Sequence, residues 1–217
     1  MVEEKKDAFF KKMFLKWKDE IWAHKHLITA SLILLIVATC LDYVCGNYVT
    51  KVGSALSADL ILKFITPIDL NWIFVYLFLI TVTILLVYPL FFRVKKLHLT
   101  IGHFSLLVMM RSIFMSLTHL KTPIGAIAVR FPGHLTGLVF ENDLFFSGHV
   151  AIPFLGFLIF KESKIKYFFL ASSIILGITS LLMHRHYSID VFAAFFITYG
   201  TYKLGNWAFK KIDKTEN

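Results

Sequence analysis

The sequence predicts an all-α, polytopic membrane protein: six transmembrane helices preceded by an amphipathic, basic N-terminal arm. Three observations support this fold class. The chain of 217 residues is 57% hydrophobic and has a mean hydropathy of +0.70, far from the average of soluble domains. Its apolar residues fall into six runs, and a chain of this length has room for about six spans of roughly 20 residues each. Its lysines and arginines gather in alternate connections between these runs.

The N-terminal arm, residues 1–26, is expected to form an amphipathic helix on the membrane surface. It contains the stretch FFKKMFLKW, in which aromatic residues and lysines repeat. This pattern is typical of interfacial helices, whose apolar face enters the lipid while the lysines stay in water. A secretory signal is not expected, because the arm is too charged and the first apolar run lacks a small-residue cleavage site close behind it.

The six apolar runs form one predicted membrane domain, residues 27–204, and residues 205–217 form a tail. The second run has no charged residue and is long enough to cross a bilayer. The third run contains Arg111 and the sixth contains Asp190, while polar residues interrupt the fourth. In chain order the runs are Leu27–Leu41, Leu70–Phe92, Leu97–Leu120, Leu144–Phe160, Tyr167–Met183 and Tyr187–Tyr202.

The formal net charge of +9 is explained by membrane topology. In a six-span arrangement, 17 of the 23 lysines and arginines fall on one side, in the arm, the tail and two connections, and five fall on the other. An excess of these residues marks the cytoplasmic side. Both termini are therefore predicted to be cytoplasmic, with the basic residues contacting anionic lipid. Nucleic acid is not needed as a partner.

Two polar clusters fall on the opposite, exoplasmic side, which is lumenal, periplasmic or extracellular. The first is ENDLFFSGHV, Glu141 to Val150, and the second is MHRHYSID, Met183 to Asp190. Ionisable residues at membrane depth are costly and usually face the interior of a helix bundle. Because each cluster stands at the head of an apolar run, we expect the two clusters to meet in one site.

The residue types in these clusters suit phosphoryl transfer. His186 and Asp190 are four residues apart and share a face of a helix. A carboxylate there fixes the imidazole tautomer and leaves the other ring nitrogen's lone pair free. In the first cluster, Gly148 lets the backbone approach a ligand, and the Ser147 hydroxyl and N–H groups at a helix start favour an anion. One of the two histidines, His149 or His186, could attack phosphorus while the other protonates the leaving oxygen.

Three motifs in order resemble the type 2 phosphatidic acid phosphatase superfamily, most closely its sphingomyelin synthase branch. DLFFSGH, from Asp143 to His149, is similar to that branch's aspartate, aromatic step and SGH. HYSIDV, from His186 to Val191, is similar to its HYTxDV motif. The stretch from Arg111 to Thr118, followed by Pro123, is similar to its arginine with a Thr-rich, Pro-ended span.

The resemblance implies six spans with an exoplasmic site, and it implies roles for three residues. His186 would be the nucleophile, Asp190 its orienting partner, and His149 the general acid and base. The donor would be a membrane phospholipid, the acceptor a lipid alcohol such as ceramide or diacylglycerol, and neither a cofactor nor a metal would be required. With water as acceptor, the same site would act as a phosphatase or phospholipase C. The expected substrate-binding residues are Arg111, Asp143, Ser147, Gly148, Arg185 and Tyr187.

Two departures from the family pattern affect the substrate. The phosphatase branch carries an arginine next to a serine shortly before the second histidine, whereas this chain has Thr179-Ser180-Leu181. This weakens the interpretation as a plain phosphatase. The synthase branch usually has an acidic residue just before the catalytic His-Tyr, whereas this chain has Arg185. An arginine favours an anionic head group or a bare phosphate, so a phosphatidate-like donor gains weight.

Several alternatives stay open at this level. Arg111 is either a phosphate ligand or a structural arginine, Asp143 either lines the head-group pocket or solvates its loop, and Asp42 either pairs with a basic residue or marks the outer boundary of its run. A zinc site is not expected, because it would need three or four ligands in fixed geometry. The histidines that could contribute are His119, His134, His184 and His186. A different class of function is a non-catalytic, lipid-binding membrane protein.

Overall fold

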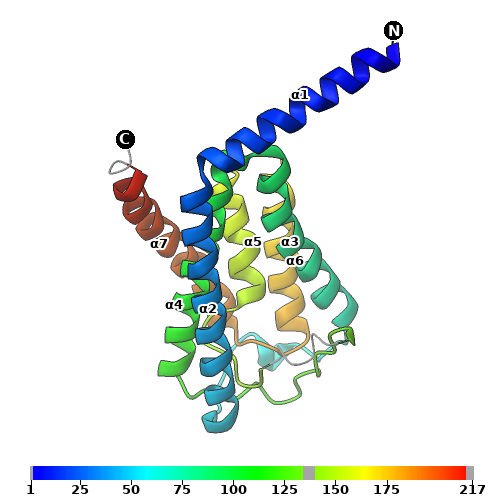
Figure 1. Ribbon diagram of the computed structural model, residues 1–217. Helices are drawn as coiled ribbons and strands as arrows, with labels where there is room; N and C mark the ends of the chain where they lie inside the picture. The colour runs from blue at the N-terminus through cyan, green and yellow to red at the C-terminus, as the bar shows by residue number, and fades with distance from the viewer. Residues whose placement is uncertain (1, 134–139, 214–217) are drawn as a thin grey trace.

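The computed structural model describes the backbone of residues 2–133 and 140–213 and the side chains of residues 11–133 and 140–209. Across these residues the chain has seven α-helices, two short 3₁₀ turns and no strand (Figure 1). The helices are α1 (Val2–Ala23), α2 (Lys25–Val52), α3 (Asn71–Phe92), α4 (Leu97–Leu117), α5 (Gly148–Ile159), α6 (Lys166–Leu182) and α7 (Ser188–Asp213), and the turns are η1 (Leu62–Phe64) and η2 (Val94–Lys96).

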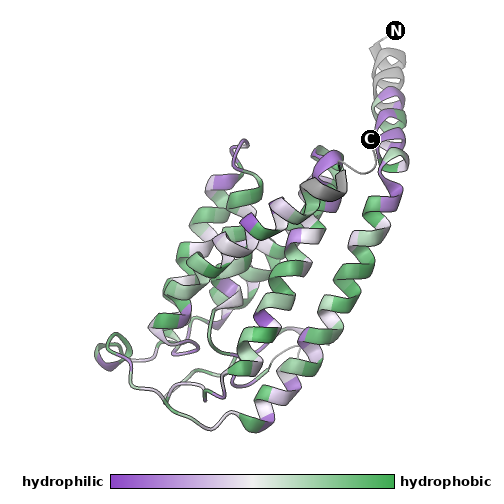
Figure 2. Cartoon of the chain, turned by 90° about the vertical axis from the view of Figure 1, so that its left-hand side faces the viewer, coloured by the Kyte–Doolittle hydropathy of each residue, from purple (hydrophilic) through white to green (hydrophobic). Residues whose placement is uncertain are grey.

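Helix α5 lies at the centre of the bundle and packs against α3, α4, α6 and α7. The core around it is apolar and includes the buried side chains of Leu107, Val150, Leu155 and Phe169. Helix α2 packs mainly on α4 and leaves many apolar side chains exposed. Figure 2 shows hydrophobic residues along most of the helix surfaces and hydrophilic residues toward their ends. This distribution suits a bundle whose outer surface contacts lipid.

Three segments are long and apolar enough to cross a membrane: α2, α3 and Val94–Leu117. Helices α5 and α6 are apolar but shorter, with 12 and 17 residues. All six predicted runs contain a helix, but only three described segments meet the length and hydropathy of a span, so six spans are not confirmed. The fourth run is shorter than predicted because its first residues, from Leu144, belong to the loop that leads into α5.

Two helices extend beyond the apolar runs that they contain. Helix α2 continues to Val52, well past Leu41, because the carboxylate of Asp42 is paired inside the protein and does not mark the end of the helix. Helix α7 continues to Asp213, so most of the predicted tail, 205–217, is helical. Within this extension, the ring of Phe209 packs 4.9 Å from the ring of His103 on α4.

The N-terminal arm is helical, as predicted, and α1 projects from the bundle end at which both termini lie (Figure 1). The indole of Trp17 donates a hydrogen bond of 2.8 Å to the carbonyl oxygen of Leu90. That carbonyl belongs to the last turn of α3, where helical partners are missing. The arm is therefore tied to the end of α3. Its placement on a membrane surface stays a prediction.

The opposite end of the bundle consists of loops that bind one another. The Thr122 N–H donates to Asn142 Oδ1 at 3.0 Å, and the Asn142 N–H donates to Thr122 Oγ1 at 3.2 Å. The Ser188 N–H, at the start of α7, donates to Asp59 Oδ2 at 2.6 Å. Ala55 and Leu120 form an isolated parallel bridge. These contacts hold the loops 53–70 and 183–187, together with the segments 118–133 and 140–147, over the ends of the helices.

Candidate active site

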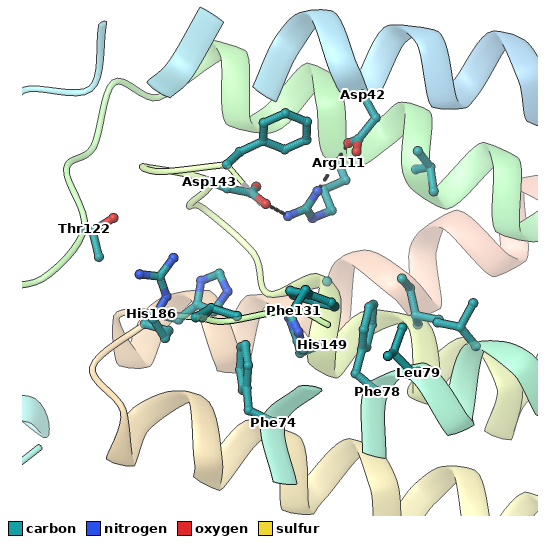
Figure 3. A pocket seen from close by; sticks show the side chains of 17 residues that line it. Asp42, Phe74, Phe78, Leu79, Arg111, Thr122, Phe131, Asp143, His149 and His186 are labelled. Carbon is teal, nitrogen blue, oxygen red and sulfur yellow. Dashed lines mark hydrogen bonds and ion pairs between the residues drawn. The ribbon is translucent and has the colours of Figure 1, made fainter. Parts of the chain in front are cut away.

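A cavity of about 310 Å³ lies at the loop end of the bundle, bordered by α2, α3, α4 and α5 (Figure 3). One part of its wall is polar and the rest is apolar. Six of the nine predicted site residues line it: Arg111, Asp143, Gly148, His149, Arg185 and His186. The apolar wall includes Phe74, Phe78, Leu79, Val82 and Ile152. The structure thus brings both polar clusters of the sequence to one cavity.

The His186–Asp190 pair is buried at the start of α7. Asp190 is fully buried, and its Oδ2 lies 3.2 Å from His186 Nδ1. The same oxygen accepts a hydrogen bond of 3.1 Å from the Tyr187 N–H. Asp190 therefore satisfies a backbone donor at the helix start, as an acidic residue in a capping box does. An Nδ1–H tautomer of His186 donates to this carboxylate and leaves Nε2 as the nitrogen with a lone pair.

His149, in the first turn of α5, is held by two aromatic rings of α3. Its ring centroid lies 3.8 Å from that of Phe74, with the rings stacked, and 4.1 Å from that of Phe78. Its Nε2 is buried and makes no hydrogen bond with any described residue. The ring is thus fixed by packing while one nitrogen stays available for a substrate proton.

Arg111 is held by two carboxylates. Its Nη1 lies 3.2 Å from Asp42 Oδ1, and its Nη2 is paired with Asp143 Oδ2 (Figure 3). Its Nε is buried, and no described residue bonds it. Of the two alternatives for Asp42, pairing with a basic residue is the one observed. Asp143 lines the cavity, but it also anchors the loop to α4 through Arg111.

Packing gives a second reason for a glycine at position 148, in addition to the predicted approach of a ligand. A methyl group at its Cα would lie 2.9 Å from Arg111 Nε, closer than real Cβ contacts are found. The absence of a side chain therefore lets the guanidinium lie against the turn that begins α5. The sequence predicted that a ligand approaches the backbone at Gly148. In the structure, the group that lies against Gly148 is the Arg111 guanidinium.

Ser147 and Tyr187 lie beside the cavity and do not line it. The Ser147 N–H donates to the Asp190 carbonyl oxygen at 3.2 Å, which joins the two motifs. The Ser147 hydroxyl is buried and has no hydrogen-bond partner among the described residues. The Tyr187 hydroxyl donates to the Lys121 carbonyl oxygen at 2.9 Å and accepts from the Ser57 N–H at 3.2 Å. Tyr187 therefore holds neighbouring loops together.

Arg185 lies in the loop between α6 and α7 and is the cavity-lining cation that pairs with no described carboxylate. Burial lowers the pKa of its guanidinium below the ordinary value, although Asp143 and Glu141 oppose this shift. Arginine keeps its charge at neutral pH all the same. A second depression, of about 440 Å³, lies on the loops at the same end of the bundle. It shares Arg185, Thr122 and Val129 with the cavity.

The remaining histidines considered in the sequence make other contacts. His184 Nδ1 lies 3.2 Å from the Ile124 carbonyl oxygen, and its Nε2 lies 3.0 Å from that of Ile65. His119 Nε2 lies 3.0 Å from the Tyr48 hydroxyl. His134 lies outside the described residues. Within the part of the chain that is described, no group of three or more His, Cys, Asp or Glu residues is placed to hold a metal ion.

Phe74 and Phe78 are site residues that the sequence argument missed. They are one helical turn apart on α3, in a run that is apolar throughout, so no change of residue type marked them out. Asp42 was considered as a pairing partner or as the boundary of its run, and its place in the cavity wall is new. What the arrangement offers chemically is an oriented imidazole, a second imidazole in an aromatic setting, a cation without a carboxylate partner, and an apolar wall.

Comparison with known families is consistent with this chemistry. Residues 142–207, about a third of the chain, match the family model described as PAP2 superfamily C-terminal. The matched segment contains Asp143, His149, His186 and Asp190. No curated protein and no solved structure matches the chain. The family match supports the type 2 phosphatidic acid phosphatase superfamily, whose members are typically phosphatases or phosphotransferases, and it does not distinguish the sphingomyelin synthase branch.

Proposed function

We propose that the chain is an integral membrane enzyme that moves a phosphate-containing head group from a phospholipid to ceramide or diacylglycerol through a phosphohistidine at His186. The observation that carries this proposal is the buried His186–Asp190 pair, which opens into the same cavity as His149. The apolar wall of that cavity can accept the hydrocarbon part of a lipid next to the polar groups. The match to the superfamily supports phosphatase or phosphotransferase chemistry on lipids.

The first step forms a bond between His186 Nε2 and phosphorus and breaks the bond from phosphorus to the glycerol oxygen of the donor. His149 gives that oxygen its proton, and diacylglycerol leaves. Asp190 stabilises the positive charge on the His186 ring. In the second step, His149 takes the proton of the acceptor hydroxyl, the hydroxyl oxygen bonds to phosphorus, and the bond to Nε2 breaks.

Arg111 and Arg185 differ in how much positive charge they have free to bind the donor phosphate. Arg111 already pairs with Asp42 and Asp143, so much of its charge is balanced. Arg185 has no such partner among the described residues and lines the cavity. We therefore assign the phosphate oxygens to Arg185, with Arg111 Nε as a second donor. This assignment favours an anionic, phosphatidate-like donor over a cationic head group.

Hydrolysis is the second candidate function, as a lipid phosphate phosphatase or a phospholipase C-type enzyme. It is favoured by the depression on the outer loops, which shares Thr122, Val129 and Arg185 with the cavity. Water arriving from this side would replace the lipid alcohol in the second step. A non-catalytic lipid-binding protein is the third candidate, and it predicts no turnover at all.

The site is proposed to lie on the exoplasmic side, with both termini in the cytoplasm. Two facts support this placement. Both termini lie at one end of the bundle and the loops that border the cavity lie at the other (Figure 1), and 17 of the 23 lysines and arginines belong to segments predicted on the terminal side. Lysine and arginine excess is the signal that sets membrane orientation.

The test uses the purified chain in liposomes with a phosphorus-labelled phospholipid and ceramide or diacylglycerol, and then with labelled phosphatidate. Label on the lipid alcohol establishes transfer. Label only in free phosphate or a free phospho-head group establishes hydrolysis. His186→Ala should abolish either activity, whereas His119→Ala, a change outside the cavity, should leave it intact. Absence of turnover with every donor, or full activity of His186→Ala, would refute the proposal.

A further inference from the structure

A second cavity, of about 410 Å³, lies at the terminal end of the bundle, where α1 meets the elbow between α3 and α4. One wall comes from α1 and includes Lys16, Trp17 and Glu20, and the other is the elbow Phe91–Lys96. We call this feature the elbow groove. It lies at the end of the bundle opposite the candidate active site (Figure 1), and the proposed chemistry makes no use of it.

The charge in the elbow groove is strongly positive. Four cations line it, namely Lys16, Arg93, Lys95 and Lys96, against one acid, Glu20. Among the described residues, Lys96 is the groove cation that has an ion pair, 3.4 Å from Glu162. Arg93, Lys95 and Lys16 form no ion pair with a described carboxylate, and the one acid in the groove, Glu20, leaves it with a net positive charge. Like charges gathered in one groove favour binding of an anion.

The position of the groove at the end of two span-length segments, and the exposed aromatic rings beside it, favour a lipid over a soluble anion. The elbow separates two segments that are long and apolar enough to span a membrane, since α3 ends at Phe92 and the next segment begins at Val94. Phe91 and Phe92 are 61% and 73% exposed beside the cations. Aromatic rings next to lysines and arginines match a ligand with an anionic head and a hydrocarbon chain. A soluble phosphate would leave the rings without a partner.

The two walls of the groove are held in place without a ligand. The Trp17 indole donates to the Leu90 carbonyl oxygen at 2.8 Å, which ties α1 to the last turn of α3. Because this bond holds α1 beside the end of α3, binding does not have to bring the two walls together. We propose that the elbow groove binds the head group of an anionic phospholipid in the leaflet next to the termini.

The test measures lipid binding to the purified full chain in detergent by native mass spectrometry. Short-chain phosphatidylglycerol is titrated against phosphatidylcholine of the same chain length, with inorganic phosphate as competitor. We expect phosphatidylglycerol to bind preferentially. The double change Arg93→Gln with Lys95→Gln should weaken that binding by roughly tenfold or more, because each cation near an anionic lipid contributes about a factor of five.

Two controls make the result specific. Lys161→Gln with Lys164→Gln removes the same charge from exposed positions outside the groove and should change binding less than about twofold. Arg93→Lys with Lys95→Arg keeps the charge and should bind as the unmodified chain does. Equal losses in both glutamine pairs, equal binding of the two lipids, or displacement by phosphate would overturn the proposal. Because the readout is binding, failure here leaves the proposed catalytic activity untouched.

Discussion

The carboxylate of Asp190 accepts hydrogen bonds from two donors at once, and these two bonds orient His186, the nucleophile of the proposed reaction. Its Oδ2 meets both His186 Nδ1 and the Tyr187 N–H. Loss of the negative charge would leave the ring in place but remove the stabilisation of the imidazolium that forms during attack. The His186–Asp190 pair is thus a single unit in structure and in the proposed chemistry.

Asp190→Asn should lower kcat for lipid turnover by about 10²–10⁴-fold with KM changed only a few-fold, because the charge matters in the transition state more than in substrate binding. Steady-state kinetics in liposomes measures this split. Asp69→Asn, a change in an exposed loop residue, is the matched control and should leave kcat unchanged. A kcat preserved in Asp190→Asn would show that the pair is only structural.

Gly148→Ala should destabilise the protein, because the new methyl group would meet Arg111 Nε at 2.9 Å. Displacing a guanidinium held by two carboxylates has an expected cost of about 1–3 kcal/mol in the free energy of unfolding. Thermal unfolding in detergent measures it. Gly200→Ala on α7 is the control, since nothing lies within 4 Å of the added methyl group. Equal melting temperatures for the two variants would contradict the packing account.

Residue-level prediction from sequence worked where spacing carries the information. The four-residue interval predicted that His186 and Asp190 share a helix face. The two side chains are in contact, but His186 precedes α7, and they meet because the Asp190 carboxylate reaches back over the start of the helix. Phe74 and Phe78 could not be found this way, because stacking on His149 depends on which turn of an apolar helix faces α5. Contact of Ser147 and Tyr187 with a ligand stays a prediction. The contacts present join neighbouring loops: the Ser147 N–H donates to the Asp190 carbonyl oxygen, and the Tyr187 hydroxyl donates to that of Lys121.

At the scale of elements, the start of α7 depends on a loop that is distant in sequence. Asp59 accepts hydrogen bonds from the N–H groups of Ile61, Leu62 and Ser188. Partial burial raises the pKa of Asp59, but these backbone donors outweigh it and leave the pKa below its ordinary value. The ionised carboxylate therefore fastens the loop 53–70 to the first turn of α7, two residues from His186.

Asp59→Asn should lower the melting temperature at neutral pH by about 2–4 °C, the effect of losing one good helix-capping interaction. A depressed pKa stabilises the fold above the unfolded value, about 3.9, and this stabilisation is lost as the pH falls through the folded pKa. The difference between the two proteins should therefore shrink below about pH 4. Melting curves at pH 7 and pH 3.5 test this, and a difference that is independent of pH would refute it.

The positions of the helices followed from apolar runs, but their ends did not. A charged residue was taken as the end of the first run, whereas Asp42 is neutralised by Arg111 and α2 continues to Val52. The tail was separated from the sixth run, whereas α7 continues into it and Phe209 packs against His103. In both cases the helix makes a contact with a residue distant in sequence beyond the end of its apolar run, and hydropathy does not reveal such a contact.

At the scale of the whole molecule, the two ends of the bundle differ in chemistry. One end carries the termini and the elbow groove, and the other carries the loops around the cavity (Figure 1). Charge counting in the sequence anticipated this polarity, because lysines and arginines are distributed by side. The run Tyr167–Met183 matched the length of α6. Charge counting and hydropathy could not anticipate that α5 has only 12 residues, because the first residues of its run belong to the loop over the cavity.

This polarity makes orientation testable with single cysteines. In a Cys40→Ser, Cys45→Ser background, Leu60→Cys in the loop 53–70 should react with a membrane-impermeant maleimide on intact cells or sealed spheroplasts. Lys161→Cys, between α5 and α6, should react only after the membrane is permeabilised, because the side richer in lysine and arginine is retained in the cytoplasm. Both side chains are exposed, so burial does not explain a difference in labelling. The reverse pattern would place the cavity in the cytoplasm and its substrate in the inner leaflet.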